Sequence, residues 1–167
     1  VISSNAVAAS GLQGGLIVQL GSSDVSTAAK LSNTGRYLFH VIDKDADSIS
    51  AAQKLIHKNG RYGLSWAEHT NQPSRLPYAE NVVNLIIIRD YSIPLSELLR
   101  VLTPGGAIVV TDPKIMPLAA LSDVSLTSAE QQDNYIVAVK RWPMEMDVWS
   151  HPRHAADGNA VSNDTLV

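Results

Sequence analysis

The fold class is decided by residues 82–88, which read Val82-Val83-Asn84-Leu85-Ile86-Ile87-Ile88. This run is apolar on both faces and rich in β-branched residues, as is typical of a central strand in a parallel sheet that is covered by helices on both sides. Pro94 then opens a segment in which leucines recur with helical spacing, and Thr103-Pro104-Gly105-Gly106 breaks it. Residues 107–110 return as an apolar strand. The stretch therefore predicts a strand–helix–strand unit.

The same alternation extends toward the N-terminus. A strand is predicted over 16–20, and good N-cap residues at 22–24 open a helix that should end near Gly35. A second strand over 37–42 is followed by a helix from about 45 to 59, with apolar residues on one stripe. The repeated order of strand and helix favours crossover connections and a parallel sheet.

The remaining elements are shorter. Residues 62–66 predict a third strand, and a polar loop follows it over 69–76. The signals from 112 to 133 are mixed, with a short helix expected at 118–121, and 135–139 alternates like an edge strand. The expected fold class is α/β, a doubly wound and mostly parallel sheet with helices on both faces and an antiparallel edge strand near the C-terminus.

Length and charge restrict the function. A chain of 167 residues is long enough for one domain with one core, and we divide it into a lead-in (1–15), an α/β domain (16–142) and a junction segment (143–167). Charged residues make up 17%, below the roughly 25% of an average soluble protein, which favours a large surface covered by a partner. The net charge of -3, without a basic cluster longer than two residues, argues against nucleic acid as a partner.

The composition also excludes several kinds of site. With Cys 0 there is no disulfide, thiolate nucleophile or cysteine-based metal site. No apolar run approaches the roughly 18 to 20 residues that span a bilayer. The first residues lack a methionine and the charged start of a signal peptide, which favours a trimmed product.

Four short motifs carry a resemblance to a known family. They are Val18-Gln19-Leu20-Gly21-Ser22-Ser23-Asp24, Val41-Ile42-Asp43, Leu76-Pro77-Tyr78 and Leu99-Arg100-Val101-Leu102-Thr103-Pro104-Gly105-Gly106. In order, they resemble the glycine-rich turn, the acidic end of strand 2, the L-P-[FY] element and the L-[RK]-P-G-G entry of class I S-adenosylmethionine-dependent methyltransferases. The resemblance covers about residues 16–111 and implies a Rossmann-like fold.

The resemblance implies a cofactor site for S-adenosylmethionine, formed by Gly21, Ser22, Ser23, Asp43, Glu68 and His69. Asp43 follows Gly21 by about 20 residues, the interval at which an acidic residue meets ribose hydroxyls in nucleoside sites. Alternatively, Asp43 caps the helix that begins near Asp45. Glu68 and His69 lie where the family reads adenine, and the alternative is an exposed pair in a loop. No residue stands out as a catalytic base.

The chain departs from the family pattern in its polar groups. Only Gly21 remains of the usual G-x-G-x-G turn, which leaves the floor of a cofactor pocket incomplete. Gln19 and Asn84 stand where the family has carboxylates, and a neutral amide attracts a cationic cofactor less strongly. These departures predict a degenerate site.

The C-terminal segment carries a second resemblance. Residues 142–151 and 159–167 look like the junction in large, mostly planctomycete-type bacterial proteins, where such a domain precedes a pyrroloquinoline-quinone-like β-propeller. We therefore expect the propeller or an associated chain to contact Trp142, Met144, Met146 and Trp149. His151, His154 and Asp157 have metal-ligand spacing, but Pro152 interrupts the helix that such a site would need, so no metal is expected.

The leading hypothesis is a degenerate methyltransferase-like domain that serves as a structural or docking module of a multidomain propeller protein, exported to the periplasm or cell surface. The alternative is an active, cytoplasmic methyltransferase that acts on a small molecule. In that case Asp43 would hold the ribose and Gly21 the methionine end of S-adenosylmethionine. A nicotinamide-binding domain is a third possibility, but its glycine fingerprint is equally absent.

Overall fold

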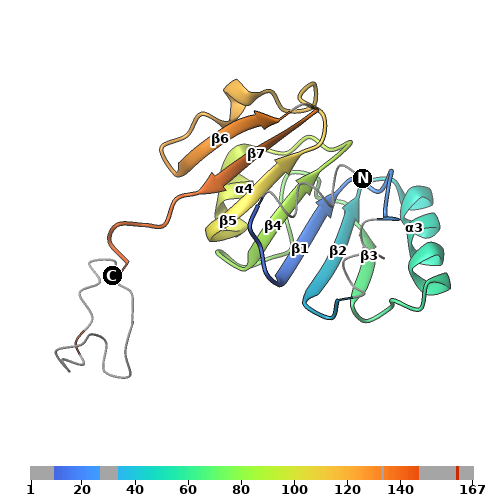
Figure 1. Cartoon of the computed structure of the whole chain (residues 1–167). Coiled ribbons are helices and arrows are strands. Elements are labelled where there is room, and N and C mark those ends of the chain that lie inside the picture. Colours follow the sequence, from blue (N-terminus) through green and yellow to red (C-terminus); the bar gives the residue numbers. More distant parts are fainter. Residues whose placement is uncertain (1–9, 27–33, 133, 147–160, 162–167) are drawn as a thin grey trace.

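The structure is a computed structural model that describes residues 10–26, 34–132, 134–146 and 161. The described part forms a seven-stranded sheet with the order β3-β2-β1-β4-β5-β7-β6 (Figure 1). Its strands are β1 (Gly15–Leu20), β2 (Tyr37–Asp43), β3 (Ser65–His69), β4 (Val83–Ile88), β5 (Leu102–Val110), β6 (Leu126–Gln132) and β7 (Tyr135–Lys140). The helices are α3 (Ala46–Lys58), α4 (Leu95–Val101) and the short 3-10 helix η1 (Leu118–Leu121).

Five neighbouring strands, β3, β2, β1, β4 and β5, run parallel to one another. The strand β7 is antiparallel to both β5 and β6. The chain winds outward from β1 to β3 and then returns to β4 on the other side of β1. This reversal places the topological switch point between the carboxyl ends of β1 and β4. The predicted doubly wound, mostly parallel sheet is therefore confirmed.

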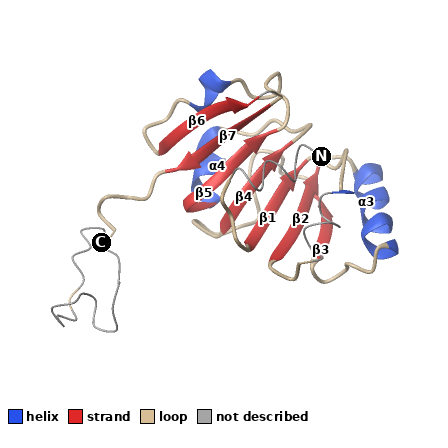
Figure 2. Cartoon of the chain, in the orientation of Figure 1, coloured by secondary structure: helices blue, strands red, loops and turns tan. Residues whose placement is uncertain are grey.

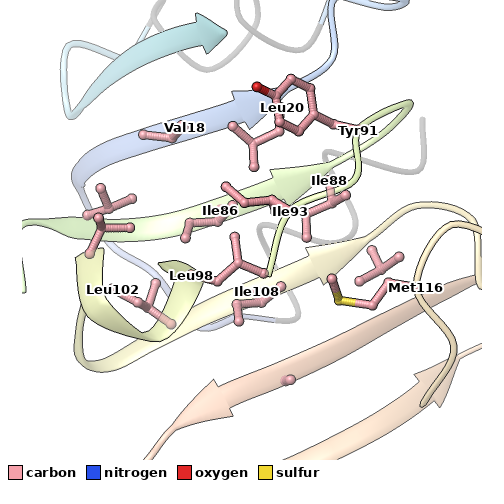
Figure 3. Packing of buried hydrophobic residues seen from close by; sticks show 14 of the residues in the cluster. Val18, Leu20, Ile86, Ile88, Tyr91, Ile93, Leu98, Leu102, Ile108 and Met116 are labelled. Atoms are coloured by element: carbon pink, nitrogen blue, oxygen red, sulfur yellow. The ribbon is translucent and has the colours of Figure 1, made fainter. Parts of the chain in front are cut away.

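Alternate residues of the strands face two separate apolar layers. On one face Leu98 of α4 packs against strand residues such as Ile86 and Ile108, as Figure 3 shows. On the other face Ile49 and Ile56 of α3 share an apolar cluster with strand residues such as Phe39 and Val41 of β2. The helices therefore cover opposite faces of the sheet (Figure 2), as the apolar strand 82–88 predicted.

Two strand predictions need correction. The third strand begins at Ser65 rather than at Tyr62, because residues 61–64 form a turn in which the carbonyl of Arg61 accepts hydrogen bonds from the amides of Leu64 (3.1 Å) and Ser65 (2.9 Å). The strand β6 was missed, and it rather than β7 forms the edge of the sheet. Its sequence LTSAEQQ is polar because an edge strand has one exposed side, and this polarity reads as a loop.

The strand β5 begins earlier than predicted, directly after α4. Its Leu102 pairs with Val83, and the register then shifts, so the expected break at 103–106 is a bulge within the strand. A Cβ at Gly106 would lie 2.8 Å from the carbonyl oxygen of Thr103 and 2.9 Å from that of Asn84. Only glycine permits this close approach of the bulged β5 backbone to itself and to β4.

Two other predicted elements have different outcomes. The short helix at 118–121 is confirmed as η1. The helix expected from 22 to 35 falls mostly on residues 27–33, which lie outside the described residues. Among the described helices, none combines the length and the hydropathy needed to cross a bilayer.

Candidate functional site

The predicted site residues lie at the carboxyl ends of β1, β2 and β3. The amide of Gly21 donates to the carbonyl of Ile42 (2.9 Å), and the amide of Thr70 donates to that of Asp43 (2.9 Å). Asp43 and His69 are partners in the parallel pairing of β2 and β3. The topology therefore brings Gly21, Asp43 and His69 to one edge of the sheet, where α/β folds of this kind bind ligands.

Asp43 is bonded by the turn that follows β1. Its Oδ2 accepts hydrogen bonds from the amide (2.8 Å) and the hydroxyl (2.6 Å) of Ser22. Its Oδ1 accepts from the amide of Asp45 at 3.2 Å. The alternative role of Asp43 as a helix cap is wrong, because Asp45 is the N-cap of α3 and accepts from the amide of Ser48 at 2.7 Å.

Other side chains fasten the same turn from within. Gln19 is fully buried, and its Nε2 donates to the carbonyls of Gly21 (2.8 Å) and Asp24 (3.0 Å). Across the switch point, the guanidinium of Arg89 contacts the carboxylate of Asp24 at 3.2 Å. Hydrogen bonds from Ser26 hold the pKa of Asp24 below its usual value, and Arg89 adds to this effect. The turn after β1 is thus held in place by hydrogen bonds and an ion pair from the protein's own side chains.

The backbone geometry of the chain requires a glycine at position 21. Its φ is 93°, and a Cβ there would lie 2.8 Å from the amide nitrogen of Asp90, just after β4. The neighbouring Ser23 is exposed. A glycine at this position is therefore explained by the approach of two backbone segments, without reference to a ligand.

Asn84 does not belong to this site. Its Oδ1 accepts a hydrogen bond from the amide of Leu16 (2.9 Å), which lies at the start of β1. The amino ends of β1 and β4 are at the opposite edge of the sheet from Gly21 and Asp43. The expectation that residue 84 replaces a cofactor-facing carboxylate is therefore wrong.

Glu68 and His69 line a cavity of about 340 Å³ between the end of β3 and the loop that follows it, together with Gln72, Arg75 and Leu76. The Nε2 of His69 lies 3.1 Å from the carbonyl oxygen of Lys44. The side chain of Glu68 is 61% exposed. These residues lie near Asp43, but Asp43 does not line the cavity.

A buried polar cluster beside this cavity was not predicted. Nδ1 of His40, on β2, is hydrogen-bonded to the hydroxyl of Tyr78, and its Nε2 lies 3.4 Å from Oε2 of Glu68. Burial lowers the pKa of His40 to about 4, so its ring is neutral at pH 7. Burial and the charge of Glu68 raise the pKa of Tyr78. The one feature of the sequence that could have indicated this cluster is His40, a histidine within an otherwise apolar strand.

Arg100 positions Tyr78 and explains the spacing of two motifs. Its guanidinium donates to the carbonyls of Tyr78 (2.9 Å) and Leu76 (3.2 Å) and pairs with Glu97 at 2.6 Å. The carboxylate of Glu97 in turn accepts from the amide of Leu76 at 2.7 Å. The Leu76-Pro77-Tyr78 element is therefore tied to α4 by charge-assisted hydrogen bonds.

Tyr91 lies next to the switch point and is 2% exposed. Its hydroxyl is without a hydrogen-bond partner among the described residues. Burial raises the pKa of this hydroxyl, and the charge of Asp43 raises it further. Tyr91 therefore places a buried hydroxyl within the electrostatic reach of Asp43, which the sequence did not indicate.

The expected docking residues, Trp142 and those of the junction segment, are only partly described. Trp142 is 49% exposed and Met144 is 90% exposed, whereas Met146 is half-buried. Trp149 and the possible metal ligands His151, His154 and Asp157 lie outside the described residues. Within the described ranges, no group of three histidine or carboxylate side chains is placed to hold a metal ion.

Comparison with known proteins supports the fold. No family profile and no curated protein matches the sequence. A proposed S-adenosyl-L-methionine-dependent methyltransferase from Methanococcus maripaludis has a TM-score of 0.70 at 15% identity, with 85% of this chain and 84% of that chain covered. A SAM-dependent methyltransferase from Aquifex aeolicus has a TM-score of 0.59 at 14% identity, covering 82% and 87%.

A third similar structure contains ligands. Geranyl diphosphate C-methyltransferase from Streptomyces coelicolor A3(2), solved with Mg²⁺, geranyl diphosphate and S-adenosyl-L-homocysteine, has a TM-score of 0.64 at 11% identity, covering 84% of this chain and 79% of that chain. At such identities the likeness shows the fold. The chain has the Rossmann-like fold of class I methyltransferases, which confirms this part of the resemblance.

Proposed function

We propose that the chain is a degenerate methyltransferase-like domain that serves as a structural or docking module of a larger protein. The observation that carries the proposal is the pairing of Ser22 with Asp43. In nucleoside sites, the acidic residue at the end of the second strand accepts hydrogen bonds from ribose hydroxyls. Here the Ser22 hydroxyl donates to that carboxylate at 2.6 Å, where the ribose of a cofactor would bond.

The surrounding turn supports the same proposal. A ligand at the switch point would have to compete with the Arg89–Asp24 ion pair and with both hydrogen bonds from Ser22 to Asp43. Hydrogen bonds to charged groups contribute about 1.5–3 kcal/mol each, so their loss would offset much of the binding energy of a small cofactor. As it stands, the ribose-binding position does not fit S-adenosylmethionine.

The docking role rests on exposed apolar residues of the α/β domain and of the start of the junction segment. Trp142, Met144 and Val124 are large apolar residues with exposed fractions of 49%, 90% and 86%. Contiguous exposed apolar patches are characteristic of interaction surfaces, and aromatic residues often dominate their energy. We infer that the partner is a following pyrroloquinoline-quinone-like β-propeller of an exported protein, or an associated chain.

Calorimetric titration with S-adenosylmethionine and S-adenosylhomocysteine tests the proposal. We expect no saturable heat from the unmodified protein up to about 1 mM ligand, a concentration that would detect even weak binding. Ser22→Ala would remove the hydroxyl that donates to Oδ2 of Asp43 and so leave the carboxylate able to accept a hydrogen bond from a ligand. Ser23→Ala is the matched control in the same turn. Micromolar binding by the unmodified protein that Asp43→Ala abolishes would contradict the proposal.

The second candidate is an active methyltransferase for a small molecule. The cavity of about 340 Å³ favours it, because Glu68 and His69 line that cavity at the edge of the sheet where the related fold binds its cofactor. Asp43 would then have to exchange Ser22 for a ribose, and catalysis would consist mainly of aligning the acceptor with the methyl group. The same titration distinguishes the two candidates.

A further inference from the structure

A second cavity, of about 670 Å³, lies at the outer edge of the sheet between α3 and β3. Figure 1 shows the helix beside this edge strand. The cavity is lined by side chains that include Gln53, Lys54, His57, Tyr62, Trp66 and Glu68. The three from α3 share one stripe of the helix, since residues three and four positions apart lie on the same side. The volume is within the range of about 300–1,000 Å³ that is usual for small-molecule sites.

The aromatic walls of this cavity are held in place by other residues. The ring of Trp66 stacks on that of His40, with centroids 4.5 Å apart and an interplanar angle of 23°. Tyr62 stacks on His57 at 4.4 Å and 21°. The Trp66 ring, which stacks on the buried His40, loses little entropy when a ligand binds, so this wall is preorganised, whereas Tyr62 is 66% exposed.

One polar side chain of the lining, Gln53, is oriented by a hydrogen bond to β3. Nε2 of Gln53 donates to the outward carbonyl of Ala67 at 2.9 Å, which orients the amide and covers a polar group of the strand edge. The Glu68 carboxylate lies 3.4 Å from Nε2 of His40, and its side chain is 61% exposed. Glu68 is therefore accessible to a ligand.

Opposite charges line the same cavity. Glu68 contributes a carboxylate from β3, and Lys54 contributes an ammonium group from α3. No ion pair joins the two in the described part of the chain. A ligand that carries both charges could therefore interact with both side chains, whereas a singly charged ligand would leave one of them uncompensated.

We propose that this cavity binds a small zwitterion with a flat ring. The ring would lie against Trp66 and Tyr62, with its positive charge toward Glu68 and its negative charge toward Lys54. Stacking and cation–π attraction favour a flat cationic ring over an aliphatic group, and the two charged side chains select for the zwitterion. The site is separate from Asp43 and does not depend on the function proposed above.

N-methylnicotinate, a cationic ring with a carboxylate, is a suitable probe. Its binding to the full chain can be followed by NMR titration and compared with that of N-methylnicotinamide, which lacks the carboxylate, and of benzoate, which lacks the cation. We expect the zwitterion to bind about 5-fold more tightly than either, as partly exposed charge pairs and cation–π contacts allow. Lys54→Gln should remove its advantage over N-methylnicotinamide, and Glu68→Gln its advantage over benzoate.

Lys58→Gln, on the last turn of the same helix, and Glu130→Gln, on β6, are the matched controls, because both residues are exposed and lie outside the cavity. Both controls should leave the affinity unchanged, and unaltered unfolding midpoints will show that every variant is folded. Equal binding of the three probes, no binding of N-methylnicotinate, or equal effects of Lys54→Gln and Lys58→Gln would overturn the proposal.

Discussion

The hydroxyl of Ser22 lies 2.6 Å from Oδ2 of Asp43, although the two residues belong to different strand–helix units. This hydrogen bond joins the turn after β1 to the carboxyl end of β2, and the amide of Ser22 reinforces it at 2.8 Å. Hydrogen bonds to a carboxylate are stronger than those between neutral groups. The pair therefore stabilises the edge of the sheet at which a ligand of this fold would otherwise bind.

Replacing Ser22 by alanine should destabilise the domain by about 1–3 kcal/mol, because Asp43 loses a charge-assisted hydrogen bond in a partly buried position. Ser23→Ala, at an exposed position in the same turn, should change the free energy of unfolding by less than about 0.5 kcal/mol. Urea denaturation of both variants measures the difference. Equal effects of the two substitutions would show that the Ser22–Asp43 bond contributes little.

His40 should make the stability depend on pH. Its pKa is lowered from 6.5 to about 4 in the folded protein, so the unfolded chain binds more protons between these values. The stability contributed by the neutral, buried ring is fully present above pH 6.5 and is lost as the pH falls toward 4. A shift of this size corresponds to about 3 kcal/mol.

Denaturation midpoints measured from pH 7 to pH 4 test this expectation. In His40→Gln, which keeps a polar side chain at the same position, the decline in stability between pH 6.5 and 4 should be smaller. An identical decline in both proteins would mean that other groups control the pH dependence.

Asn84→Asp should not create a cofactor site. The residue lies at the amino end of β4, where its side-chain oxygen accepts from the amide of Leu16 at 2.9 Å. A carboxylate can accept the same bond, so the variant should fold. Calorimetry with S-adenosylmethionine should show no more heat than for the unmodified protein, and saturable binding by this variant would contradict the placement of Asn84.

The leucines of α4 should differ in their contribution to stability. Leu98 is fully buried, whereas Leu99 is only partly buried at the margin of the same apolar layer. Leu98→Ala should cost about 2–5 kcal/mol, as is usual for a buried leucine, and Leu99→Ala should cost less. Chemical denaturation checks the order, and the reverse order would contradict the observed orientation of the helix.

Trp142→Ala tests the docking surface. The side chain is 49% exposed, and a Cβ added at Gly105 would lie 4.0 Å from the indole. Its removal should change the free energy of unfolding by less than about 1 kcal/mol. Association with the propeller or partner chain should weaken by about 2 kcal/mol or more. A large loss of stability in the isolated domain would assign Trp142 to the domain's own core.

The sequence by itself determined the elements whose signal is local. Residues 82–88 predicted a central strand because five of the six residues of β4 are buried, and such burial requires a nearly continuous apolar run. The stripe that includes Ile49 and Ile56 predicted α3 because one helical face packs on the sheet. Gly21 and Asp43 were placed in one site by the family resemblance and by the interval of about 20 residues between them.

Only the tertiary structure decided which polar groups meet. The polar strand β6 could not be distinguished from a loop, because its backbone bonds to β7 compensate for a weak apolar pattern. Asn84, placed near the cofactor site by the family resemblance, bonds to Leu16 at the opposite edge. The contacts of Ser22 with Asp43, and of His40 with Trp66 and Glu68, join separate strands and turns. Such contacts depend on strand order and register, which arise when the apolar layers pack and have no local signature in the chain.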